Sequence, residues 1–257
     1  MKKLIHASNL LTKLNKNDNI DFLLACADEY YIYHKNFSMQ NIEKSVKYWN
    51  CYLDFVRNNN KKNKKTVFSS QSKFESTILE ETLFRMFKEY ESEKIRIGGI
   101  KAFSNMFFSP LDFDDFKINS NIKINTKDQD FAIYKQVQIE INDNMNPVKA
   151  FVPIIAIECK TYLDKTMLEG AMATAEKIKN GNPYCRFCIV TETCQVDLRV
   201  DIKNTKIDQI YVLRKRNKNE QINADVVNLI YEDTNKHLKN KWSDIEKNIK
   251  DKGIVFN

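Results

Sequence analysis

Glycine and proline are scarce in this chain, with 5 and 4 copies among 257 residues. Loops that cradle nucleotide phosphates need several closely spaced glycines. Gly98 and Gly99 are the only adjacent pair, and no GxGxxG or GxxxxGK[ST] string occurs. The scarcity therefore argues against a protein kinase, a P-loop nucleotide hydrolase and a typical Rossmann dehydrogenase, and against a collagenous or low-complexity architecture.

Long apolar runs are also missing. No stretch of 18 apolar residues occurs, so the sequence predicts no membrane span. Polar residues between Met1 and Lys13 interrupt any apolar segment of the kind that a secretory signal needs. We therefore expect a cytoplasmic protein whose six cysteines are reduced.

Histidine is rare, and the cysteines do not compensate for it as metal ligands. Only three histidines occur, and none are paired in a motif, which disfavours nucleases built on paired histidines. Cys185, Cys188 and Cys194 suggest a zinc site, but no fourth ligand lies nearby in the sequence. Cys185 and Cys188 flank an expected strand, where residues three apart face opposite ways, so we expect buried structural cysteines.

What the chain does contain is apolar and basic material. The hydrophobic fraction is 42%, with 16 Phe and 11 Tyr, which is enough for one large domain or for a main domain with a smaller helical one. The net charge of +7 is compatible with a polyanionic partner, although many basic proteins bind no nucleic acid.

The first third of the chain has helical periodicity. Apolar residues recur at three- and four-residue spacing, which predicts helices near 4–14, 20–31, 39–56 and 71–90. Five cations fall among the nine polar residues 57–65, which indicates an exposed linker or a phosphate-contacting loop. We expect an N-terminal helical region with a basic linker over 1–66, followed by a second, larger domain over 67–257.

The pattern changes to strands in the second half. The Phe-rich region between Gly99 and Lys117 has no clear period. Beyond it the sequence predicts strands at 122–124, 129–141 (one strand or two), 151–160, 186–191 and 209–213, with helices at 163–179 and 224–249. Phe151–Lys160 is apolar on both faces, which is typical of a central strand, and Pro153 fits only near its start. The order of elements predicts an α/β fold with a mixed β-sheet flanked by helices.

Charged residues interrupt this central strand near its carboxyl end. Glu158 and Lys160 are two residues apart, so they face the same way on a strand. Asp130 lies on the preceding strand and could converge on Glu158, although Asp128 shares its strand face. Two carboxylates and the backbone carbonyl of Cys159 would form an oxygen-only site that suits Mg²⁺, with Asp130, Glu158 and Cys159 as its ligands.

Asp130 together with Glu158-Cys159-Lys160 resembles the D…(D/E)xK signature of the PD-(D/E)xK nuclease superfamily, although Gln129 stands where the name has proline. The strings at 157–167 and 71–81 are similar to the Bpu/Dde-like group of type II restriction endonucleases. This resemblance implies a restriction-endonuclease-like fold and Mg²⁺-dependent, sequence-specific hydrolysis of double-stranded DNA. Asp130, Glu158 and Lys160 would be catalytic.

The resemblance also implies a further acid from a helix before the sheet. Glu80 is the favoured candidate, with Glu75 and Glu81 as rivals. A near-palindromic site would need a homodimer, or a heterodimer with a related subunit. The basic cluster at 214–218 is either a solvated loop or a DNA-contacting one. The alternatives are a non-catalytic DNA-binding relative and a repair or transposon-type nuclease of the same superfamily.

Overall fold

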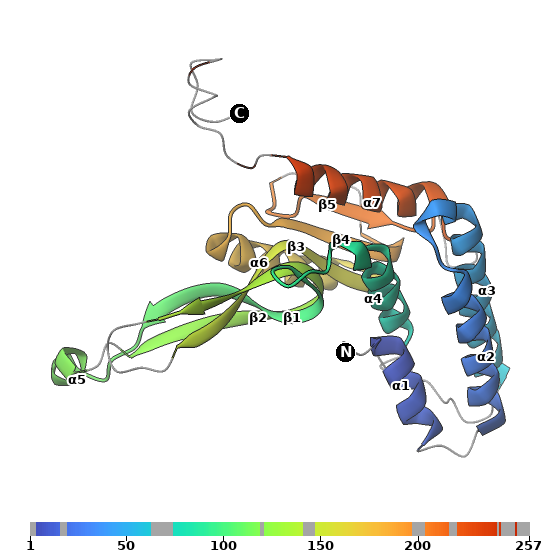
Figure 1. Cartoon of the computed structure of the whole chain (residues 1–257), viewed down its shortest axis with the longest axis horizontal. Helices are drawn as coiled ribbons and strands as arrows, with labels where there is room; N and C mark the ends of the chain where they lie inside the picture. Colours follow the sequence, from blue (N-terminus) through green and yellow to red (C-terminus); the bar gives the residue numbers. More distant parts are fainter. Residues whose placement is uncertain are drawn as a thin grey trace.

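A computed structural model describes residues 4–15, 20–62, 74–118, 121–140, 147–196, 204–215, 220–240, 242 and 250 (Figure 1). The helices are α1 (Ile5–Leu14), α2 (Ile20–Asn36), α3 (Ile42–Lys62), α4 (Phe74–Met86), α5 (Phe113–Ile118), α6 (Lys165–Gly181) and α7 (Ala224–Lys239), with short 3-10 turns η1 (Met39–Asn41) and η2 (Lys88–Tyr90). The strands are β1 (Arg96–Phe108), β2 (Ile122–Ile139), β3 (Val148–Leu163), β4 (Arg186–Cys194) and β5 (Gln209–Val212).

The strands form one mixed sheet in the order β1-β2-β3-β4-β5. β2 runs antiparallel to β1 and β3, whereas β3, β4 and β5 run parallel to one another. β3 is the middle strand, as its apolar character predicted. The predicted mixed sheet flanked by helices is therefore confirmed.

Helices cover both faces of this sheet because β3 and β4 are apolar on both sides. Ile155 and Ile157 join a buried cluster that includes residues of α3, α4 and α7, and Ala156 joins a second cluster beneath α6. Cys188 belongs to the first cluster and Cys185 to the second, so these cysteines do face opposite ways. Both are buried free thiols.

Pro153 lies further inside its strand than the sequence predicted, because β3 begins five residues before it, at Val148. The register between β2 and β3 shifts here, from Ile133 opposite Ile155 to Tyr134 opposite Pro153. A bulge interrupts the ladder of hydrogen bonds, so proline's missing N–H is tolerated there.

The three predicted N-terminal helices are present, but the predicted linker is wrong at its start. α3 continues through Arg57 to Lys62 instead of ending near Val56. Arg57 is held by acidic partners on α4 and β4, which keeps this turn helical. Residues 63–65 lie outside the described part of the chain. Buried residues of α2 and α3 share one apolar cluster with Ile97 and Phe131 of the sheet.

The region that the sequence left unassigned is mainly β1, and β2 is one long strand. Figure 1 shows these strands running out from the body as an arm that ends in α5. Large apolar side chains are exposed along its end: Met106, Phe107, Phe108, Leu111, Phe113, Phe116 and Ile118. The Phe-rich region without a clear period therefore corresponds to an exposed arm, where apolar side chains are not arranged around a core.

At the C-terminal side, α7 ends at Lys239, ten residues before the predicted end; residues 241 and 243–249 of that prediction lie outside the described part. None of the helices described by the structure combines the length and apolar character that crossing a lipid bilayer requires.

Candidate active site

The candidate site forms where β2 and β3 separate. Their last backbone partners are Phe131 and Ile157. Between the pairs Gly98–Ala132 and Ile100–Gln129, β2 has one residue more than β1, which is a bulge at Asp130 and Phe131. Bulges re-aim side chains and end regular pairing. The sequence placed Asp130 at the start of a strand, whereas it lies in this bulge inside an 18-residue strand.

The Asp130 carboxylate replaces a backbone carbonyl at this point. Its Oδ2 accepts a hydrogen bond of 2.9 Å from the backbone N–H of Cys159. The N–H and C=O of one strand residue point to the same side. The Cys159 carbonyl is therefore directed toward the side where β2 and β3 separate.

Glu158 and Lys160 lie on either side of Cys159 and meet Asp130. Lys160 Nζ is 2.7 Å from Glu158 Oε2 and 3.5 Å from Asp130 Oδ2. The exposed fraction of the side chain is 19% for Asp130, 13% for Glu158 and 26% for Lys160. The structure thus brings the three predicted residues together in a partly open site.

Electrostatics keep Lys160 charged in this arrangement. Burial lowers the pKa of Lys160, but the adjacent Glu158 and Asp130 carboxylates outweigh it and raise the pKa above the ordinary value. Asp128, the alternative acid, is exposed and lies opposite Lys101 of β1. Its side chain makes no contact with Lys160 of the kind that Asp130 makes.

The three acids of α4 have different surroundings. Glu75 pairs with Arg57 at 2.9 Å. Glu81 is held by Arg85 at 2.6 Å, by the Tyr30 hydroxyl, and by backbone N–H groups in the first turn of α1. These bonds tie Glu75 and Glu81 to Arg57, Arg85 and the N-terminal helices.

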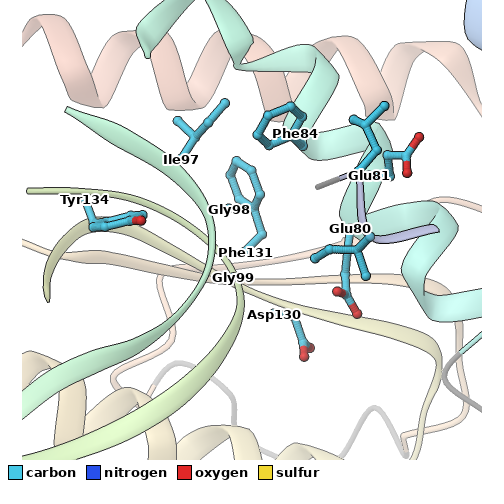
Figure 2. A pocket seen from close by; sticks show the side chains of 11 residues that line it. Glu80, Glu81, Phe84, Ile97, Gly98, Gly99, Asp130, Phe131 and Tyr134 are labelled. Atoms are coloured by element: carbon cyan, nitrogen blue, oxygen red, sulfur yellow. The ribbon is translucent and has the colours of Figure 1, made fainter. Parts of the chain in front are cut away.

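Glu80 extends from α4 toward Asp130 (Figure 2). Both residues line a cavity of about 300 Å³ between α1, α4 and the bend of β1 and β2. Burial raises the pKa of the Cys159 thiol well above its usual value, and the charges of Asp130 and Glu80 raise it further. The electrostatic influence of Glu80 therefore reaches the strand that carries Glu158 and Lys160.

Gly99 allows β1 to lie close against this bulge. A Cβ added at Gly99 would lie 3.2 Å from the carbonyl oxygen of Asp130 and 3.4 Å from that of Gln129. Gly98 has a φ of +119°, which side-chain-bearing residues rarely adopt. In the sequence, this pair was noted only because no glycine-rich phosphate loop accompanies it. In the structure, Gly98 and Gly99 shape the backbone around Asp130.

The chemical type of the donors at this site suits a divalent cation. Carboxylate oxygens of Asp130, Glu158 and Glu80 and the Cys159 carbonyl are hard ligands of the kind that Mg²⁺ prefers. Within the described residues, no three His, Cys, Asp or Glu side chains are gathered closely enough to form a cluster of metal ligands by themselves. The Lys160 ammonium lies between two of the carboxylates instead.

A buried ion network beside the site escaped sequence reasoning. Glu192 of β4 accepts two hydrogen bonds from Arg57 and one from Arg214 Nε, at 2.7 to 2.9 Å. Arg214 is only 2% exposed, so the predicted basic loop is wrong for this residue; Lys215 is exposed, and 216–218 lie outside the described residues. No local pattern could have shown that these distant charges meet.

Comparison with known proteins supports the family suggested by the sequence motifs. A model of the Bpu10I restriction endonuclease family matches residues 71–241, which is more than half of the chain. Among solved structures, the chain resembles one described as the native BbvCI A2B2 tetramer at low resolution, with a TM-score of 0.69 and 19% sequence identity over 91% of this chain and 95% of that one. This likeness shows a shared fold. A search of curated proteins gives no match.

The matched region contains helix α4 and strands β2 and β3, which carry the candidate residues, and helix α6, which follows β3. The predicted resemblance to the Bpu/Dde-like restriction enzymes is thereby confirmed. This chain belongs to the Bpu10I restriction endonuclease family.

Proposed function

We propose that this protein is a type II restriction endonuclease that uses Mg²⁺ to hydrolyse phosphodiester bonds of double-stranded DNA at a specific sequence. The observation that carries the proposal is the meeting of Asp130, Glu158 and Lys160 where β2 and β3 part, in a chain of a restriction endonuclease family. The products would carry 5′-phosphate and 3′-hydroxyl ends.

Asp130, Glu158, Glu80 and the Cys159 carbonyl would hold the cation. When bound, Mg²⁺ would polarise the scissile phosphate and stabilise the charge that develops on it. The Cys159 N–H holds Asp130 by one oxygen, so the orientation of this carboxylate is set before any ligand arrives. Such preorganisation avoids reorientation during the reaction.

Lys160 would act as a cation. The neighbouring carboxylates raise its pKa, so the ammonium stays protonated and donates hydrogen bonds. Next to a phosphate it would neutralise charge and orient the attacking water. General-base action by Lys160, which the sequence left open, would require this ammonium to lose a proton against the pull of two carboxylates.

Two active sites are needed to cut both strands of a duplex, and the described residues of one chain supply one such site. We therefore propose that two copies act together on the DNA, or one copy and a related subunit if the recognised sequence is asymmetric.

The test begins with plasmid DNA and Mg²⁺. The wild-type protein should give discrete fragments, whereas Asp130→Asn and Lys160→Ala should lower the cleavage rate by about a hundredfold or more, because each removes a group that contacts the reacting phosphate or its cation. Both variants should still bind DNA in a gel-shift assay.

Lys165→Ala is the matched control, since Lys165 is close in sequence but 76% exposed at the start of α6. Its cleavage rate should match that of the wild type. Cutting by Asp130→Asn and Lys160→Ala at the wild-type rate would contradict the proposed site. Binding without any cutting by the wild type would instead identify a non-catalytic relative, and cutting without discrete fragments would favour a repair or transposon-type nuclease.

A further inference from the structure

Gln129 is the residue before Asp130, and it is 96% buried, with only 4% of its surface exposed. Neighbouring residues on a regular strand point to opposite faces. The bulge in β2 breaks that alternation between the pairs Ala132–Gly98 and Gln129–Ile100. Gln129 and Asp130 can therefore both reach β3, although they are adjacent in the sequence.

The amide group of Gln129 contacts the Glu158 carboxylate. Its Nε2 lies 2.7 Å from the backbone carbonyl of Asp128 and 3.4 Å from Glu158 Oε1. Both neighbours are acceptors, so the nitrogen of the amide must be the atom that faces them. The contact with Glu158 is longer than an ideal hydrogen bond, so it is the weaker of the two.

The two oxygens of Glu158 are thus held from two directions. Lys160 Nζ donates a hydrogen bond of 2.7 Å to Oε2, and the nitrogen of the Gln129 amide faces Oε1. Without Gln129, the strong charge–charge bond to Lys160 would set the orientation of Glu158 by itself. A carboxylate turned toward Lys160 presents its oxygens less well to a cation between β2 and β3.

The oxygen of the Gln129 amide gives a second, independent indication of a role in the site. Gln129 Oε1 is buried and has no hydrogen-bond partner among the described residues. A buried acceptor without a donor is destabilising, whereas an apolar side chain of the same shape would avoid the penalty. A glutamine at this place is therefore explained better by the site than by packing.

We propose that Gln129 is a positioning residue that orients Glu158 for cation binding, a role that rests on the proposed nuclease function. Its Nε2 holds Glu158 Oε1 against the pull of Lys160, and its Oε1 accepts a hydrogen bond from a water molecule in the site. Gln129 itself contacts neither the cation nor the phosphate.

The experiment compares Gln129→Met, which keeps the length of the side chain and removes its amide, with the wild type. Gln136→Met is the control, since Gln136 lies on the same strand but is exposed. Binding of Mn²⁺ in place of Mg²⁺, followed by electron paramagnetic resonance without DNA, should weaken threefold or more in Gln129→Met and stay unchanged in Gln136→Met. The Mg²⁺ concentration for half-maximal cleavage should rise by a similar factor, while the melting temperature stays the same or rises and cation-free DNA binding stays unchanged.

Gln129→Asn provides a second variant in case Gln129→Met does not fold. It keeps the amide but is one methylene too short to reach Glu158, so it should weaken Mn²⁺ binding in the same way. Mn²⁺ affinity within threefold of the wild type in the folded variants would overturn the role of Gln129. If the wild type cuts no DNA, the proposed function fails, but the Mn²⁺ comparison still decides whether Gln129 positions Glu158.

Discussion

Where β2 and β3 separate, side-chain hydrogen bonds replace the backbone hydrogen bonds of the sheet. Asp130 accepts the Cys159 N–H that a regular ladder would give to a carbonyl, and Gln129 and Lys160 hold the two oxygens of Glu158. The two short bonds, from the Cys159 N–H to Asp130 and from Lys160 to Glu158, hold these acids before a ligand binds. At the residue scale, the site is therefore largely preorganised by its own strand neighbours.

A second residue-scale feature is the buried His6 of α1. Its ring nitrogens contact the Thr77 hydroxyl at 3.1 Å and the Tyr52 hydroxyl at 2.6 Å. Burial lowers the pKa of His6 from 6.5 to about 3, and the charge of Arg85 adds to this. His6 is therefore neutral in the folded protein at physiological pH.

The lowered pKa predicts an acid-sensitive fold. Below pH 6.5 the unfolded chain binds a proton at His6 that the folded chain refuses, so this contribution to stability is complete above pH 6.5 and is lost as pH falls toward 3. The free energy of unfolding should fall by up to about 1.4 kcal/mol per pH unit between pH 6 and 5. In urea denaturation, the free energy of unfolding of His6→Gln should change less with pH between pH 6 and 5 than that of the wild type. The exposed His34→Gln should keep the wild-type slope; equal slopes in all three proteins would contradict this prediction.

At the scale of elements, helix α6 covers the sheet face behind the site. Asp164 caps it, accepting a hydrogen bond of 2.8 Å from the Met167 N–H, and its apolar residues Leu168, Ala171, Ala175 and Ile178 are buried. Its last residue, Gly181, lies against the backbone of β1. α6 therefore packs against both the central strand β3 and the part of β1 near Ser104, where the arm begins.

Two glycines of α6 predict opposite effects of the same substitution. A Cβ at Gly181 would lie 2.3 Å from the Ser104 carbonyl oxygen, so Gly181→Ala must displace β1 or the helix end. A Cβ at Gly170 meets nothing within 4 Å. Gly170→Ala should raise the free energy of unfolding by roughly 0.5–1 kcal/mol through helix propensity, whereas Gly181→Ala should lower it by about 1–3 kcal/mol. Chemical denaturation measures both, and a stabilised Gly181→Ala would show that the contact with β1 is looser than described.

On the scale of the whole molecule, the N-terminal helices and the arm lie at opposite ends of the sheet (Figure 1). α1 is tied to α4 through Glu81, and α3 to β4 through Arg57, so the helical region is joined to the elements of the site by charged bonds as well as apolar contacts. These connections make the position of Glu80 depend on helices outside the matched family region.

The proposed pairing of two chains predicts the outcome of a mixing experiment. If each chain cuts one strand, an excess of Lys160→Ala protein mixed with wild type should form mixed dimers with one working site. Supercoiled plasmid should then accumulate as nicked circles before linear DNA appears. Wild type mixed with Lys165→Ala is the control and should give linear DNA. Linear DNA without a nicked intermediate in the first mixture would contradict one site per strand.

The sequence by itself determined the central strand, the pairing of Glu158 with Lys160 on one face of it, and most helices. These follow from local rules: residues two apart on a strand share a face, and apolar residues recur every three or four positions on a helix. The family resemblance carried by Asp130, Glu158 and Lys160 came from the same local strings.

Only the tertiary structure decided which distant groups meet. The bulge at Asp130 depends on Gly99, which lets β1 lie close against it, and Glu75 and Glu81 of α4 meet partners from α1, α2 and α3. Arg57 and Arg214, which read as loop cations, converge on Glu192 from separate elements. Such contacts depend on the packing of segments far apart in the chain, and a local pattern carries no information about that distance.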